Sequence, residues 1–194
     1  MDRFTAGRHT AFFDANVLYP AELRNFIMRL ALQGLFRARW SDQVHEEWMN
    51  AVLRQRPDIE RSKLERTRDL MNAHAEDCLV TGFESLIEAL DLPDPNDRHV
   101  LAAAIRTGAG VIVTYNLKDF PAAKLEPYGL EAQHPDEFIT HLLDLNTGSA
   151  VAAAKEHRRS LKNPPFTSQE YLSLLERQEL TQTVANLRNY TQVI

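Results

Sequence analysis

Short apolar runs alternate with longer amphipathic segments along most of this chain. The apolar runs have the length and composition of buried strands and occupy residues 10–16, 38–40, 77–81, 110–114 and 130–133. The amphipathic segments carry apolar residues at helical spacing and cover about 20–35, 42–53, 59–75, 95–107 and 135–145. This alternation predicts an α/β fold with a central parallel sheet flanked by helices.

Residues that start and stop helices agree with this division. Ser41 or Asp42 can cap the helix that Pro57 ends. Asp94 is a predicted N-cap because Pro95 follows it at the first helical position. Gly108 is the residue expected just after the end of that helix.

The last quarter of the chain follows a different pattern. A polar break at 146–149 precedes three segments with helical spacing, at about 150–161, 167–178 and 180–190. Thr167 and Glu170 form a predicted capping box at the start of the second segment. We therefore expect a main domain over residues 1–146 and a small helical C-terminal extension over residues 147–194.

Composition narrows the class of protein. The chain is 44% hydrophobic and 25% charged, which is typical of a globular protein and excludes a mainly disordered one. No apolar run approaches the roughly 20 residues of a membrane helix, and no apolar stretch of signal-peptide length is seen near the start. The single cysteine, Cys78, excludes an intrachain disulfide and a cysteine-rich zinc site. We expect a cytoplasmic protein without a membrane partner.

Acidic residues follow the predicted strands. Asp14 ends the first apolar run, and Asp119 lies in the loop after 110–114. The carboxyl ends of parallel strands meet at one edge of a sheet, where ligands bind. Asp94 and Asp97 begin a helix whose N-terminus faces the same edge. Glu46 and Glu47 lie early in another helix, so as many as six carboxylates are candidates for one site.

Carboxylates that converge in this way favour a divalent cation. Held together without one, they repel each other, and some would be protonated. Oxygen ligands select hard ions such as Mg²⁺ or Mn²⁺, and an ion of this kind can activate a water that attacks phosphorus. The net charge of −5 excludes a polycation but permits polyanion binding where metal ions neutralise the acids. The acids therefore predict metal-dependent phosphoryl or phosphodiester chemistry.

Three segments carry a family resemblance, and they read AFFDANVLYP, WSDQVHEEW and DPNDRHVLAAAIRTGAGVIVTYNLKDF. Together, in this order and over about residues 9–145, they resemble the PIN-domain family and, within it, the VapC-like toxins of bacterial toxin–antitoxin pairs. The resemblance implies a PIN-like fold and a metal-dependent endoribonuclease that hydrolyses RNA with a metal-activated water. The C-terminal segment resembles an extension found on a subset of these toxins.

The resemblance also assigns roles residue by residue. It selects Glu47 over its neighbour Glu46. The metal-holding and catalytic positions that it implies are Asp14, Glu47, Asp97 and Asp119. The accessory positions are Asn16, Asp94, Thr114 and Asn116, of which Asn116 departs from the Asp that many members have. The implied cofactor is Mg²⁺ or Mn²⁺, and the implied partners are an RNA substrate, a cognate protein antitoxin and a second copy in a homodimer.

Two other readings of the same residues stay open at this point. A phosphatase of the haloacid-dehalogenase type also begins with an Asp after an apolar strand, but it needs a second Asp where this chain has Asn16. A catalytically silent PIN-like domain would bind RNA or protein without cleaving anything. The nearly complete set of acids argues against the silent domain.

Overall fold

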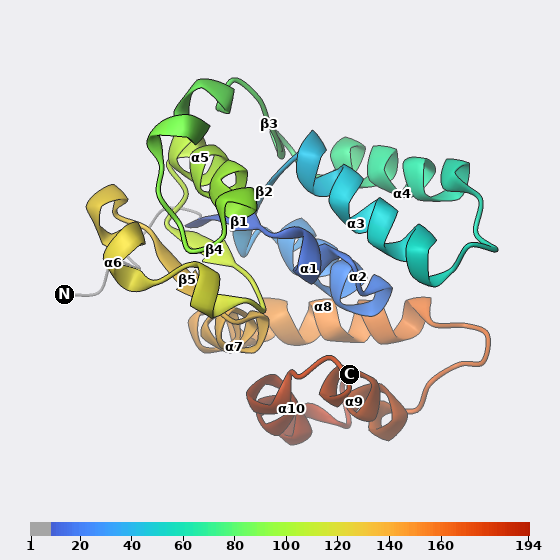
Figure 1. The fold of residues 1–194 in the computed structure, drawn as a ribbon. Coiled ribbons are helices and arrows are strands. Elements are labelled where there is room, and N and C mark those ends of the chain that lie inside the picture. The colour runs from blue at the N-terminus through green and yellow to red at the C-terminus, as the bar shows by residue number, and fades with distance from the viewer. Residues whose placement is uncertain (1–8) are drawn as a thin grey trace. The chain divides into compact units, whose positions relative to one another are not determined.

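The computed structural model of the protein describes residues 9–194 (Figure 1). Its described residues divide into two compact units. The first unit takes in the chain up to Tyr19 and the segment Phe36–His134, and the second takes in Pro20–Leu35 and Pro135–Ile194. The expected boundary between residues 146 and 147 stays a prediction.

A five-stranded parallel sheet forms the centre of the first unit. Its strand order is β3-β2-β1-β4-β5, so the first strand in the sequence lies in the middle of the sheet. The strands are β1 (His9–Phe13), β2 (Phe36–Ser41), β3 (Leu79–Val80), β4 (Val111–Val113) and β5 (Glu131–Gln133). The α/β fold with a parallel sheet is thus confirmed, and every strand overlaps a segment predicted from the apolar runs.

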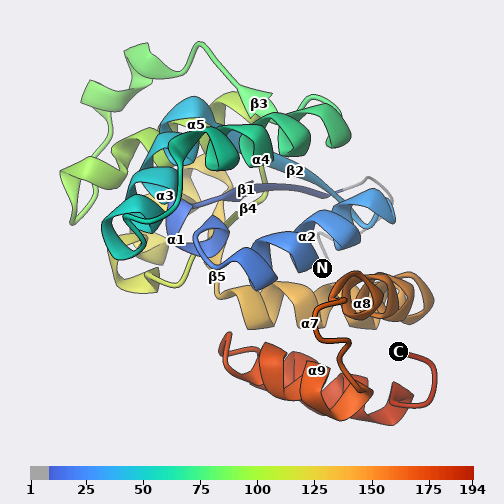
Figure 2. The same cartoon turned by 90° about the vertical axis from the view of Figure 1, so that its right-hand side faces the viewer.

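Helices of the first unit flank this sheet. They are α1 (Ala15–Leu18), α3 (Asp42–Gln55), α4 (Arg61–His74), α5 (Arg98–Thr107) and α6 (Ala122–Leu125). Shorter 3₁₀ turns are η1 (Glu84–Ala89), η2 (Pro95–Asp97), η3 (Leu117–Asp119) and η4 (Glu126–Tyr128). Helix α5 packs against β1, β2 and β4, while α3 lies beside α4 and contacts α1 and β2 (Figures 1 and 2).

Burial explains why the two central strands form where they do. Phe12, Phe13, Ile112 and Val113 are all inaccessible to solvent. The strands β1 and β4 pair in register, with Phe13 opposite Val113. Burying such side chains is worth roughly 1.5–3 kcal/mol each, which favours apolar residues on both faces of these strands.

Three predicted boundaries differ from the structure, and at each of them a side chain caps a helix or a helical turn; the expected cap by Asp94 before Pro95 is itself confirmed. The first strand ends at Phe13, because the Asp14 carboxylate accepts from the backbone N–H of Ala15 and begins α1. Asp94 caps the 3₁₀ turn η2, so that α5 proper starts at Arg98. The expected break at 146–149 is a single residue, Asn146, which caps a helix beginning at the next position.

The second unit consists of helices. They are α2 (Ala21–Leu32), α7 (Pro135–Leu145), α8 (Thr147–Ser160), α9 (Ser168–Glu176) and α10 (Thr181–Leu187), followed by the 3₁₀ turn η5 (Arg188–Tyr190). Helix α2 packs on α8, α7 packs on α8 and α10, and α9 packs on α10 (Figure 1). The helical C-terminal extension is confirmed, as is the capping box of Thr167 and Glu170.

A buried aspartate joins two helices of the second unit. The side chain of Asp136, at the start of α7, accepts from the backbone N–H groups of Gln182 and Thr183, each at 2.8 Å. These groups belong to the first turn of α10, which receives no cap from its own Leu180. Asp136 therefore caps a helix that follows it by more than forty residues.

Among residues 9–194, no helix combines the length and the apolar character that crossing a membrane requires.

Candidate active site

The parallel pairing of β1 and β4 places Asp14 beside Thr114. The residues directly before them, Phe13 and Val113, are partners in the sheet, and the backbone N–H of Asp14 donates to the carbonyl of Val113 at 3.1 Å. The hydroxyl of Thr114 donates to the Asp14 carboxylate at 2.8 Å. Two residues a hundred positions apart thus meet at the carboxyl edge of the sheet, as strand order predicts.

Asn16 completes this hydrogen-bonded group. Its amide nitrogen donates to the Asp14 carboxylate at 2.7 Å and to the Thr114 hydroxyl at 3.1 Å. Its amide oxygen accepts from the backbone N–H of Tyr115 at 3.2 Å, which fixes the orientation of the amide. The Thr114 hydroxyl also accepts from the backbone N–H of Asn116 at 3.0 Å. These contacts hold the Asp14 carboxylate in one direction.

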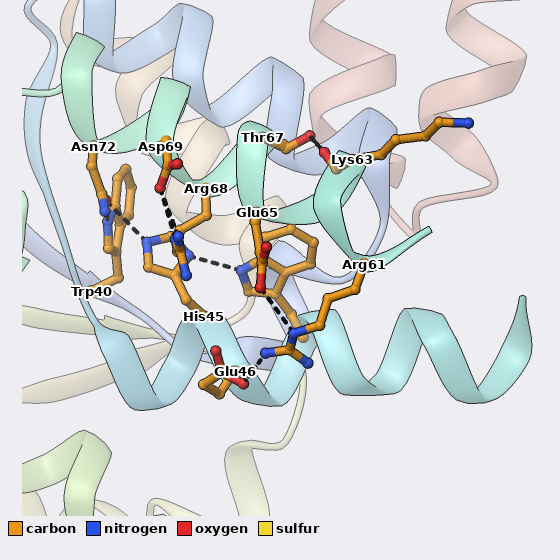
Figure 3. Close-up of polar contacts among 11 residues, drawn as sticks. Trp40, His45, Glu46, Arg61, Lys63, Glu65, Thr67, Arg68, Asp69 and Asn72 are labelled. Carbon is orange, nitrogen blue, oxygen red and sulfur yellow. Dashed lines mark hydrogen bonds and ion pairs between the residues drawn. The ribbon is translucent and has the colours of Figure 1, made fainter. Parts of the chain in front are cut away.

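Consecutive glutamates on α3 have different surroundings. Glu46 forms an ion pair with Arg61 of α4, and Arg61 also pairs with Glu65 (Figure 3). Glu47 instead contacts His99 of α5, with 2.9 Å between Oε1 and Nε2. Neighbouring residues of a helix point about 100° apart, so one glutamate reaches α4 while the other reaches the edge of the sheet.

A buried polar network anchors α3 against α4 and β2. The indole N–H of Trp48 donates to His45 Nδ1 at 3.0 Å, so the proton of this imidazole lies on Nε2. His45 Nε2 then donates to the side-chain oxygen of Asn72 at 3.0 Å, and the indole of Trp40 donates to the same oxygen at 2.7 Å (Figure 3). Because His45 is fully buried and satisfied on both ring nitrogens, this network fixes the rotation of α3 and hence the direction of Glu47.

His99 is a site residue that the sequence did not indicate. It follows Asp97 by two positions, which on a regular helix places the two side chains on different faces. Asp97 in fact lies in the 3₁₀ turn η2 before α5, so that spacing rule does not apply across the pair. His99 is only 3% exposed, and its buried Nδ1 has no hydrogen-bond partner within residues 9–194. Only the tertiary contact with Glu47 identifies its place in the site.

The acids of the site raise one another's proton affinity. Burial raises the pKa of Asp14, and the nearby Glu47 carboxylate adds to that rise, against the lowering effect of the Thr114 and Ala15 hydrogen bonds. Burial also raises the pKa of Asp97 to about 6, helped by the charges of Asp14, Asp94 and Asp119. A desolvated carboxyl beside other carboxylates loses its proton less readily.

Some of the predicted site residues line one pocket, and others lie outside its lining. A pocket of about 460 Å³ has Asp14, Asn16, Glu47, Asp97 and Asn116 in its lining. Thr114 donates to Asp14 and is fully buried. Asp119 is not part of the lining, and its carboxylate accepts a hydrogen bond from the Asn116 amide. Asp94 also stays outside the lining and accepts from the backbone N–H of Asn96 at 2.8 Å.

The donor chemistry of this pocket fits a hard divalent cation. Asp14, Glu47 and Asp97 offer oxygen ligands, and the raised pKa values of Asp14 and Asp97 indicate negative charge that a cation would relieve. Over the described residues 9–194, no three acidic, histidine or cysteine side chains are drawn together closely enough to form a ready-made metal cluster. Glu47 lines this pocket while its Oε1 contacts His99 Nε2.

Comparison with known proteins agrees with this geometry. The family model described as "PIN domain" matches residues 10–118, more than half of the chain. The chain therefore belongs to the PIN domain family. A second model, described as "VapC50 C-terminal domain", matches residues 135–189.

One relative is the protein named "Putative ribonuclease VapC50" of Mycobacterium tuberculosis (strain ATCC 25618 / H37Rv). It is 43% identical over 97 residues, which are 50% of this chain and 57% of that protein. The matched part of the chain thus spans little more than half the length of this curated relative. No solved structure matches the chain. The resemblance to the PIN domain family is confirmed, whereas nothing in these matches favours the haloacid-dehalogenase alternative.

Proposed function

We propose that this chain is a Mg²⁺- or Mn²⁺-dependent endoribonuclease and the toxin of a bacterial toxin–antitoxin pair. The observation that carries the proposal is the pocket at the carboxyl edge of the sheet, where Asp14, Glu47 and Asp97 share one space and two of them have raised pKa values. Membership of the PIN domain family and the ribonuclease name of the 43% identical relative support RNA as the substrate.

The four proposed catalytic acids would not all bind the metal ion in the same way. Asp14, Glu47 and Asp97 line the pocket and would hold the ion directly. Asp119 is bonded to Asn116, so it would act through that amide or after a change of side-chain conformation. A bound divalent ion supplies an activated water and neutralises phosphate charge during hydrolysis.

The remaining residues would orient the ligands. Thr114 and Asn16 both donate to Asp14, which favours the ionised form of its carboxyl group and aims it in one direction. His99 would hold Glu47 near the pocket from a buried position on α5. Asp94 shapes the turn that presents Asp97 and contributes negative charge near it.

The proposed toxin function also implies binding partners and a cellular location for this protein. The toxin class implies a cognate antitoxin that blocks the pocket when bound, a homodimer, and action in the cytoplasm. The match of residues 135–189 to the VapC50 C-terminal model supports assigning the helical extension to this same class.

The proposal is tested by cleavage of total bacterial RNA by the purified chain, freed of any partner. Wild type and Asp14→Asn are incubated with Mg²⁺, with Mn²⁺ and with EDTA. Asp144→Asn, which removes an equal charge from an exposed position of α7, is the matched control. We expect discrete fragments from wild type and the control in metal, and none from Asp14→Asn or in EDTA.

The other outcomes each point to a different function. Intact RNA from protein that binds Mn²⁺ by calorimetry would keep the metal site and contradict RNA as the substrate, leaving another phosphoester. Intact RNA without metal binding would favour a silent PIN-like binding module.

A further inference from the structure

The pocket extends beyond the acids, along one side of α3. Its lining also includes Tyr19, Ala51, Arg54 and Gln55. Ala51 and Arg54 follow Glu47 by four and seven positions, so the three residues share one face of the helix. Glu47, which is a proposed metal ligand, and Arg54 therefore belong to one continuous surface of α3.

Arg54 is the single basic residue among those that line this pocket. Within residues 9–194, no hydrogen bond or ion pair engages its side chain, which is exposed. Two other arginines close to it in the sequence are paired. Arg56 forms an ion pair with Asp58. Arg61 forms ion pairs with Glu46 and Glu65 (Figure 3). The exposed guanidinium of Arg54 thus has several N–H donors available to bind a phosphate, in the same pocket as the acidic residues.

The spacing along α3 indicates what this guanidinium can reach. Seven residues of helix place Arg54 about 10 Å along the axis from Glu47. A phosphate held by the acids lies at the Glu47 end of this interval, so a neighbouring phosphate of the same polymer is the nearer anion for Arg54. The anion that suits Arg54 is therefore a second phosphate on the same polymer.

We propose that Arg54 binds a backbone phosphate of single-stranded RNA that flanks the bond being hydrolysed. This inference rests on the proposed ribonuclease function and narrows its substrate to an oligonucleotide, because a nucleoside monophosphate has one phosphate and cannot supply both contacts. Tyr19, which is 36% exposed and lines the same pocket, provides a ring on which a base beside that phosphate can stack.

The test compares Arg54→Gln with Arg56→Gln. Arg56 is an exposed arginine two positions further along, paired with Asp58 and absent from the pocket lining, so it controls for the loss of one positive charge. Arg54→Lys is the conservative variant that keeps the charge. The probe is a fluorescein-labelled, single-stranded RNA of mixed sequence, about twelve nucleotides long. Its binding is measured by anisotropy in Ca²⁺, a hard ion that oxygen ligands also accept, over a series of salt concentrations.

We expect Arg54→Gln to weaken binding roughly fivefold and to lower the slope of log K against log salt by about 0.7, the value for one phosphate contact with a single strand. Arg54→Lys should keep the wild-type slope, and Arg56→Gln should match wild type in both measures. Arg54 also lies in the last turn of α3, where a positive charge favours the helix. Thermal unfolding of all variants therefore accompanies the binding series and separates any loss of folding from loss of contact.

The inference and the proposed function fail in different ways. If wild type cleaves RNA but Arg54→Gln keeps the wild-type affinity and salt slope, Arg54 does not contact phosphate and the inference is overturned. An equal loss of slope in Arg54→Gln and Arg56→Gln would also overturn it, since the effect would then be general charge. If wild type neither cleaves nor binds RNA, the proposed function fails and the inference fails with it.

Discussion

Among residues 9–194, each unit of the protein buries one aspartate, and the two have nearly equal exposure. Asp14 is 7% exposed and Asp136 is 6% exposed. Both oxygens of Asp136 accept from backbone N–H groups that begin α10, so its charge stabilises a helix terminus. Asp14 also accepts hydrogen bonds, but it lines an open pocket with Glu47 and Asp97, and its pKa is raised.

This difference shows that burial alone does not mark a functional carboxylate. Both side chains are withdrawn from water and both are satisfied. What separates Asp14 is the shared open space with other acids, where added positive charge would lower the energy of the folded protein. We therefore expect metal binding, substitution and pH to affect the stability of the folded protein differently at Asp14 and at Asp136.

The largest expected effect is stabilisation by Mn²⁺. A ligand that binds only the folded state at a hundred times its Kd raises the free energy of unfolding by about 2.7 kcal/mol. We expect wild type and Asp136→Asn to gain this stabilisation in thermal unfolding with excess Mn²⁺, and Asp14→Asn to lose most of it. An Asp14→Asn variant that gains as much as wild type would remove the proposed distinction.

Loss of the helix cap is the next largest effect. Asp136→Ala removes the acceptor of two buried N–H groups, and we expect the free energy of unfolding to fall by about 2 kcal/mol. Asp136→Asn keeps one acceptor and should lose less. Chemical denaturation in EDTA measures both, and calorimetry with Mn²⁺ should give the wild-type affinity for each. Equal stability of Asp136→Ala and wild type would contradict a capping role.

The smallest effect concerns the pH dependence of stability. The pKa of Asp97 rises from 3.8 to about 6 on folding, so the folded protein holds this proton more tightly than the unfolded chain. The stabilising contribution of protonated Asp97 is complete below the unfolded pKa and is lost as the pH rises through about 6. Asp97→Asn cannot be deprotonated, so it does not lose this stability as the pH rises. The Asp97 side chain makes no cap hydrogen bond to α5, so the substitution removes none.

We therefore expect metal-free Asp97→Asn to be more stable than wild type above pH 6, with the difference shrinking toward pH 4. The magnitude should be below about 1 kcal/mol, because Asp97 is only half-buried and solvent screens its charge. Thermal unfolding in EDTA across this pH range is the measurement. A gap that widens toward low pH would show that the pKa of Asp97 is lowered on folding instead.

Much of the fold could be predicted from the sequence because its strands are short apolar runs between clear helix signals. The run GVIVT contains β4, and Gly108 ends α5 in the left-handed conformation as expected. The prediction failed where apolar character continued past a change of structure, since the run 10–16 was predicted as a strand running into a turn, whereas β1 ends at Phe13 and Ala15 begins α1. The short helices η1 and α6 have too few turns to show a period.

The candidate site was predictable to the extent that motifs carry it. Asp14, Glu47 and Asp97 were grouped from their order along the chain, and all three line one pocket, while their role as metal ligands stays a proposal. His99 and Arg54 were not found, because their importance depends on which face α3 and α5 present to each other. Asp136 likewise looks like any acid in a first helical turn, and only the tertiary fold brings α10 to it.

The path of the chain between the two units has a consequence for protein synthesis. Helix α2 leaves the ribosome early, with Leu23, Phe26, Ile27 and Leu30 on the side that is buried in the finished protein. Its partner within the same unit, α8, is made more than a hundred residues later. The first unit can begin to fold around its sheet as it emerges, whereas the packing of α2 on α8 forms only after residues 147–160 have been made. A chain interrupted before α8 would thus lack this helix pair.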